Sequence, residues 1–150
     1  LVVVGMPGWD HGPIVAKFLP WMERGELFVL EDVPPPELRL LYRHARAAVC
    51  PSFGEGFDFS GVEAMRCGGA VVASRIPAHE EVYADAAEYF NPYSTEGLAQ
   101  ALEAVIGPGG EARRQALVER GAQVSVRYTP ERILPAWRDF LENGLAGGTR

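Results

Sequence analysis

The chain has 150 residues, of which 47% are hydrophobic and 23% charged. These values are typical of a globular protein and exclude a wholly disordered or collagen-like chain. The 14 basic and 20 acidic side chains give a net charge of −6, so we expect neither a basic nucleic-acid-binding surface nor a nucleic-acid partner. The length predicts one compact domain, which we place at 1–143, followed by a loose tail at 144–150.

Short apolar runs alternate with stretches of helical periodicity along the chain. Runs of strand character lie at 1–5, 27–30, 47–50, 70–73 and 88–90. Helical spacing occurs at 14–25, 37–46, 61–67, 80–84, 95–106 and 111–126, and a last helix opens at Pro130. We expect the first strand to be buried and Pro20 to interrupt the first helix. The alternation predicts an α/β fold, a Rossmann-like parallel sheet of about five strands with helices on both faces.

The cysteines and histidines do not form a metal-binding pattern. Cys50 and Cys67 lie in apolar surroundings, and we expect both to be reduced core residues of an intracellular protein. His11 and His79 are isolated, and His79 is expected at the surface, at a helix cap or beside the ligand pocket. No apolar run approaches the ~20 residues of a membrane span. These features predict a cytoplasmic protein, or one at the inner face of the membrane.

The loop after the third predicted strand carries the candidate chemistry. In parallel sheets, ligands bind beyond the carboxyl ends of the strands, where this loop is expected to lie. Gly54, Gly56 and Gly61 let the backbone approach a ligand, and the following helix N-terminus favours an anion. Glu55 and Glu63 flank this position and can accept hydrogen bonds from sugar hydroxyls. Amide donors for phosphate beside acceptors for hydroxyls fit a nucleotide sugar.

Each of these acidic residues also has a structural interpretation. Ser60 and Glu63 match the S-x-x-E capping box, in which Glu63 only accepts a hydrogen bond from the Ser60 backbone N–H. Glu55, considered alone, could be an acidic loop residue that is simply exposed to solvent. Asp58 either shapes the turn, because aspartate tolerates left-handed backbone geometry, or contacts the donor.

Seven residues separate the two glutamates, and their surroundings resemble a known family. The run Ser52-Phe-Gly-Glu-Gly-Phe, followed by Val62-Glu-Ala-Met and Cys67-Gly-Gly-Ala-Val-Val-Ala-Ser74, resembles the E-x7-E signature of retaining GT-B glycosyltransferases of group 1. The resemblance extends to Ile76-Pro77 and Phe90-Asn-Pro92 and covers nearly the whole chain. It implies that the chain forms the C-terminal, donor-binding half of a GT-B fold.

The resemblance implies a role for each motif residue. Glu55 would be the catalytic residue that contacts the donor sugar, and Glu63 would bind the ribose. Backbone amides of the loop would hold the sugar and the diphosphate, and the loop Glu31–Val33 would border the base. The implied donor-binding residues are Gly54, Gly56, Phe57, Asp58, Phe59, Ser60, Gly61, Val62, Glu63, Glu31, Asp32 and Val33. No cofactor or bound metal is implied.

The resemblance also implies an activity. The parent enzyme would move a hexose from a nucleotide diphosphate sugar to a glycan or lipid-linked acceptor, with retention of configuration, in polysaccharide or lipopolysaccharide synthesis. The segment 55–63 is similar to stretches of some mannosyltransferases, which favours GDP-mannose. Asp58 and Ser60 stand where the family pattern often has Gly and Pro, which leaves the donor open.

The family uses parts that residues 1–150 do not supply. These are an Arg and a Lys that neutralise the leaving diphosphate, and an N-terminal domain that binds the acceptor and any membrane. We therefore expect this chain to bind the donor without transferring the sugar alone. Two alternatives stay open, a non-catalytic nucleotide- or sugar-binding module and a GT-B-related sugar-nucleotide epimerase.

Overall fold

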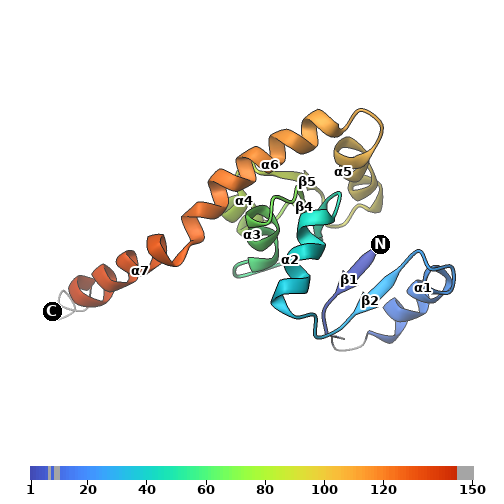
Figure 1. The fold of residues 1–150 in the computed structure, drawn as a ribbon, viewed down its shortest axis with the longest axis horizontal. Coiled ribbons are helices and arrows are strands. Elements are labelled where there is room, and N and C mark those ends of the chain that lie inside the picture. The colour runs from blue at the N-terminus through green and yellow to red at the C-terminus, as the bar shows by residue number, and fades with distance from the viewer. Residues whose placement is uncertain (7, 9–10, 145–150) are drawn as a thin grey trace. The chain divides into compact units, whose positions relative to one another are not determined.

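The computed structural model describes residues 1–150 except 7, 9–10 and 145–150, and its strands and helices confirm the predicted α/β class (Figure 1). The chain divides into two compact units, Leu1–Leu38 and Arg39–Arg150. The prediction that 1–143 forms a single domain stays a prediction. The tail expected at 144–150 lies, from residue 145 onward, outside the described residues.

The Leu1–Leu38 unit is built around two parallel strands and one helix. β1 (Val2–Val4) pairs with β2 (Phe28–Leu30), and α1 (Gly12–Glu23) lies between them in the chain. The helix continues through Pro20, so the predicted interruption is wrong. A proline inside a helix removes one backbone N–H donor, and the hydrogen bonds on either side hold this helix together.

The first strand is more exposed than predicted. Val2 and Val4 are 44% and 40% exposed, whereas the sequence predicted a buried strand. A sheet of two strands with one helix offers too little surface to cover both side chains. The expectation of a buried first strand is therefore wrong for the described residues.

The Arg39–Arg150 unit holds the other three strands. β3 (Ala48–Cys50), β4 (Val71–Ser74) and β5 (Ala87–Phe90) form a parallel sheet in the order β3-β4-β5. In the register, Cys50 lies opposite Ala73. All five predicted strands are thus present and pair in parallel, as a sheet of two strands in one unit and a sheet of three in the other.

The helices agree with the sequence pattern except at some ends. They are α2 (Pro35–His44), α3 (Phe59–Arg66), α4 (Pro77–Tyr83), α5 (Thr95–Ile106), α6 (Glu111–Ser125) and α7 (Pro130–Asp139), with a 3-10 turn at Val126–Tyr128 and a π turn at Phe140–Gly144. α4 begins three residues earlier than predicted because proline favours the first helical turn. Among the described residues, no helix has the length and apolar character to cross a bilayer.

Two hydrophobic clusters cover the two faces of the three-stranded sheet. Val71 and Ala73 of β4 belong to one cluster with residues of α3 and α4. Val72, which points to the opposite face, packs with residues of α5 and α6. The predicted helices on both faces are confirmed here. Cys50 is buried in the core, as predicted, whereas Cys67 is only partly buried.

The end of α4 contains a strained residue. Ala84 has φ 51° and ψ −117°, a backbone conformation that disfavours any residue with a Cβ. Replacing Ala84 by glycine should therefore raise the free energy of unfolding by about 1 kcal/mol. The measurement is the urea midpoint. Ala99→Gly on the exposed side of α5 is the control and should lower stability by a similar amount; a loss of stability in both variants would contradict the strain.

Candidate functional site

The loop 51–58 leaves the carboxyl end of β3 and leads into α3. Because β3, β4 and β5 are parallel, the loops that follow them lie along one edge of the sheet, where such folds bind ligands. Phe53 of this loop and Tyr93, which follows β5, have ring centroids 5.2 Å apart and are 67% and 81% exposed. The predicted site loop therefore lies at the expected edge.

The first half of the loop is fastened to β4. The Ser74 hydroxyl at the end of β4 donates a hydrogen bond to the Ser52 carbonyl oxygen. The Ser52 hydroxyl in turn donates to Glu55 Oε1 at 2.7 Å. Glu55 is exposed, so its carboxylate can also accept hydrogen bonds from a ligand. A Cβ added at Gly54 or Gly56 would meet no atom within 4 Å, so the backbone there is open to solvent.

Asp58 ends the loop and caps α3. Its Oδ1 accepts a hydrogen bond from the Ser60 backbone N–H at 2.8 Å. Its backbone is extended, with φ −100° and ψ 104°, because an N-cap residue takes β-region dihedrals. The left-handed turn considered for Asp58 is thus not formed. Asp58 is 7% exposed and has a structural role as the cap, while its contact with a donor stays a prediction.

Two side chains of α4 support Asp58 from the core. The Tyr83 hydroxyl donates to the Asp58 carbonyl oxygen at 3.2 Å, and His79 Nε2 lies 3.2 Å from Asp58 Oδ2. The rings of His79 and Tyr83 stack with centroids 5.1 Å apart. Both side chains are fully buried. The expectation that His79 lies at the surface is therefore wrong, whereas its contact with Asp58 agrees with the alternative that it lies beside the predicted site loop.

The surroundings of Asp58 favour its charged form. Burial by itself raises the pKa of Asp58, but the Tyr83 hydroxyl, the Ser60 N–H and the Cys50 thiol outweigh burial, and the pKa lies below its usual value. The stability that this carboxylate contributes is therefore present in the neutral range and lost only as the pH falls below about 4. Burial, followed by the Asp58 charge, raises the pKa of Cys50 to about 12.

The capping box considered for Ser60 and Glu63 does not form. The Ser60 N–H is bonded to Asp58, and α3 begins at Phe59, so Glu63 lies beyond the first turn. Glu63 is exposed and makes no side-chain hydrogen bond among the described residues. The fold therefore leaves the Glu63 carboxylate available to a ligand. The Ser60 amide, by contrast, is already satisfied within the chain.

The remaining motif residues differ in exposure. Gly61 and Val62 are buried, and a Cβ at Gly61 would overlap the Tyr83 ring, so packing against Tyr83 accounts for this glycine and its contact with a ligand stays a prediction. Phe57 is half-buried, with its ring 4.7 Å from that of Phe59. Phe59 itself is 69% exposed.

The loop expected to border the base lies in the other compact unit. Glu31 and Asp32 are exposed and Val33 is half-buried. Asp32 has φ 50°, one of two non-glycine residues with positive φ among those described. Such conformations gather in ligand-binding loops, although they also occur in ordinary turns. The role of this loop toward the base stays a prediction.

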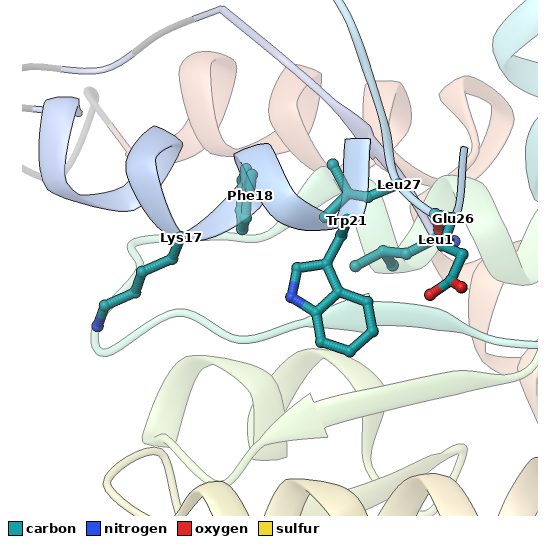
Figure 2. A pocket seen from close by; sticks show the side chains of 6 residues that line it. All are labelled: Leu1, Lys17, Phe18, Trp21, Glu26 and Leu27. Carbon is teal, nitrogen blue, oxygen red and sulfur yellow. Dashed lines mark hydrogen bonds between the residues drawn. The ribbon is translucent and has the colours of Figure 1, made fainter. Parts of the chain in front are cut away.

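A cavity in the Leu1–Leu38 unit contains none of the predicted site residues (Figure 2). The cavity has a volume of about 490 Å³, and the surface that lines it, around Trp21, is mostly apolar. The Arg24 guanidinium lies over the Trp21 ring at 4.1 Å. The lining residues are Leu1, Lys17, Phe18, Trp21, Glu26 and Leu27.

Sequence reasoning missed Ser74 and Tyr83 as supports of the site loop, and it named His79 only as a residue that could lie beside the pocket. Ser74, His79 and Tyr83 each contact the loop across 21 to 25 positions of sequence. The one available signal was Asp58, because an acidic residue in the place of a glycine needs a partner when it is buried. Among the described residues, no group of three His, Cys, Asp or Glu side chains is placed to hold a metal ion.

The chain is similar to known sugar-transferring enzymes. It is 33% identical over 99 residues to the O-antigen chain mannosyltransferase B of Escherichia coli, covering 66% of this chain and 26% of that protein. It is 38% identical over 74 residues to the O-antigen chain mannosyltransferase RfbU of Salmonella typhimurium, covering 49% and 21%. The chain thus spans about a quarter of the length of these curated relatives.

A solved structure shares the fold. Sucrose-phosphate synthase from Thermosynechococcus elongatus superimposes with a TM-score of 0.81 at 19% identity, over 99% of this chain and 39% of that one. This match agrees with the predicted GT-B architecture. The family model described as glycosyl transferases group 1 matches residues 1–108. The chain therefore belongs to the glycosyl transferases group 1 family.

Proposed function

We propose that this chain is the donor-binding part of a retaining glycosyltransferase. It binds a nucleotide diphosphate hexose, with GDP-mannose the favoured donor, and the whole protein passes the hexose to a glycan or lipid-linked acceptor. Family membership and relatives named as O-antigen chain mannosyltransferases support this proposal and a role in surface polysaccharide synthesis. A cytoplasmic location, at the inner face of the membrane or away from it, stays an expectation.

The observation that carries the proposal is the pair of exposed glutamates beside the start of α3. Neither Glu55 nor Glu63 is buried or held in an ion pair among the described residues. Carboxylates that face solvent at the ligand-binding edge of a parallel sheet are well suited to accept hydrogen bonds from sugar and ribose hydroxyls. In the proposed reaction the bond from the anomeric carbon to the diphosphate breaks, and the acceptor hydroxyl attacks from the same face.

Nucleotide binding tests the proposed role of Glu63. Titration with GDP, UDP and ADP should show binding of one nucleotide, which names the base. Glu63→Ala should then raise the Kd about ten- to a hundredfold, because a hydrogen bond to a charged group contributes about 1.5–3 kcal/mol. Calorimetry gives the Kd directly. Glu119→Ala, an exposed glutamate of α6, is the matched control and should bind as the native protein does.

The products formed by the whole protein separate the proposal from its alternatives. A glycoside that keeps the anomeric configuration of the donor supports a retaining transferase. Conversion of the free sugar nucleotide to its epimer without an acceptor would instead identify an epimerase, and binding without any product would identify a binding module. If none of the three nucleotides binds, the proposed donor site is wrong.

A further inference from the structure

Two aromatic side chains meet at the ligand-binding edge of the three-stranded sheet. Phe53 follows β3 and Tyr93 follows β5, and their ring centroids lie 5.2 Å apart with the ring planes tilted by 33°. The order β3-β4-β5 places β4 between these strands, so the strands themselves are about 10 Å apart. The two side chains therefore lean toward one another past the carboxyl end of β4.

The contact between the two rings leaves most of each side chain in solvent. Phe53 is 67% exposed and Tyr93 is 81% exposed, so each ring keeps open surface that folding does not use. A single exposed aromatic residue is ordinary, but two in contact form a patch. Such a patch at the ligand-binding edge of a parallel sheet is suited to contact a ligand.

Other groups hold the two loops in place. The loop of Phe53 is fastened at Ser52, whose carbonyl oxygen accepts a hydrogen bond from the Ser74 hydroxyl. On the other side, the Tyr93 backbone N–H donates to Asn91 Oδ1 at 3.0 Å. The rings are therefore not needed to shape their loops. Because the backbone is already fixed, a ligand that contacts the rings orders little of the chain, which lowers the entropy cost of binding.

The carboxylate of Glu55 belongs to the same short segment as Phe53. Its Oε1 accepts a hydrogen bond from the Ser52 hydroxyl at 2.7 Å, and the side chain is exposed. A carboxylate has about four acceptor positions, so Glu55 can accept further hydrogen bonds from a ligand. The segment thus combines an open aromatic surface with an acceptor for hydroxyl groups.

A hexose ring has the chemistry that matches both features. Its C–H groups form an apolar face, and its hydroxyl groups point outward around the rim. The face of an aromatic ring carries negative charge density that attracts such C–H groups, while a carboxylate accepts from the hydroxyls. A nucleobase also stacks on aromatic rings, but the base is proposed beside Glu31–Val33 of the other unit.

We propose that Phe53 and Tyr93 form an aromatic platform that binds a hexose ring beside Glu55. The inference rests on the proposed function and adds to it two residues that contact the sugar. The hexose belongs to the donor or to the acceptor glycan. Both present the same ring chemistry, and binding measurements distinguish them.

The test compares sugars with and without a nucleotide by calorimetry. The ligands are GDP, UDP and ADP, then GDP-mannose, UDP-glucose and ADP-glucose, then linear trisaccharides of mannose, glucose and galactose. If the platform binds the donor hexose, Phe53→Ala and Tyr93→Ala should each raise the Kd of the bound nucleotide sugar about two- to tenfold and leave that of the bare nucleotide unchanged. If it binds the acceptor, the rise should appear with a trisaccharide instead.

Two further variants control for the tyrosine hydroxyl and for exposed aromatic residues in general. Tyr93→Phe keeps the ring and should bind with native affinity. Phe140→Ala replaces a phenylalanine that is 58% exposed in the turn after α7, and it should bind every ligand as the native protein does. Because Phe53 and Tyr93 are exposed, their alanine variants should unfold close to the native urea midpoint.

The outcomes separate the platform from the proposed function. Native affinity of both alanine variants for every sugar overturns the platform, and it leaves the proposed function intact where a nucleotide still binds. An equal rise in Kd for a nucleotide and its nucleotide sugar assigns the rings to the nucleotide and also overturns the hexose platform. If no nucleotide binds, the proposed donor site is wrong, and a trisaccharide Kd that depends on both rings would still support the platform. Absence of binding by every ligand overturns both.

Discussion

Replacing Gly61 by valine is expected to destabilise the protein by about 3 kcal/mol, at the upper end of the cost of overpacking a core. A Cβ at this position would overlap the Tyr83 ring. Tyr83 cannot move aside freely, because it is fully buried, stacks on His79 and donates a hydrogen bond to the Asp58 carbonyl. The variant should therefore separate α3 from α4 and loosen the site loop.

The sign of a smaller change makes the test sharper. In an exposed helix, replacing glycine by alanine stabilises by about 1 kcal/mol. At Gly61 the same replacement should destabilise, whereas at Gly54, where a Cβ meets no atom within 4 Å, it should have little effect. Urea unfolding measures all three variants. If Gly61→Val unfolds at the native midpoint, Tyr83 is not the rigid neighbour described above.

The strands and most helices could be predicted from local sequence because their signals are local. Apolar runs gave the five strands, and Pro130 marked the first turn of α7. At two other prolines the predicted helix boundaries were wrong. The helix α1 passes through Pro20, and α4 begins at Pro77 instead of three residues later. In both cases the same residue type either breaks or begins a helix, and packing around it decides between the two.

The loop 51–58 and its glutamates could also be predicted from the sequence, but the buried contacts that hold the loop in place could not. The S-x-x-E pattern offered Ser60 as the cap of α3. The cap is Asp58, because Tyr83 and His79 hold it in the core from positions more than twenty residues further along the chain. Sequence spacing does not show which side chains of α4 point at that loop. The structural role of Asp58 therefore required the tertiary structure.

A substitution that creates a cavity on the face of the three-stranded sheet away from α3 and α4 should lower stability and leave the candidate site unchanged. Leu117 of α6 is fully buried in the cluster that contains Val72 and Val105. Leu117→Ala is expected to lower the free energy of unfolding by about 3 kcal/mol, from lost burial and the cavity left behind. Urea unfolding measures the loss. Leu134→Ala, at a leucine of α7 that is 62% exposed, is the control and should cost well under 1 kcal/mol.

Comparing nucleotide binding by Leu117→Ala and by Gly61→Val tests the packing on each face of the three-stranded sheet separately. Loop 51–58 contacts the cluster on the α3 and α4 face, whereas Leu117 packs on the α5 face. Below its unfolding midpoint, Leu117→Ala should therefore bind nucleotide with native affinity, while Gly61→Val should bind more weakly even where it is folded. Equal losses of affinity in both variants would show that the site depends on the packing of the whole sheet. Native affinity in both would show that the position of α3 against Tyr83 does not matter for binding.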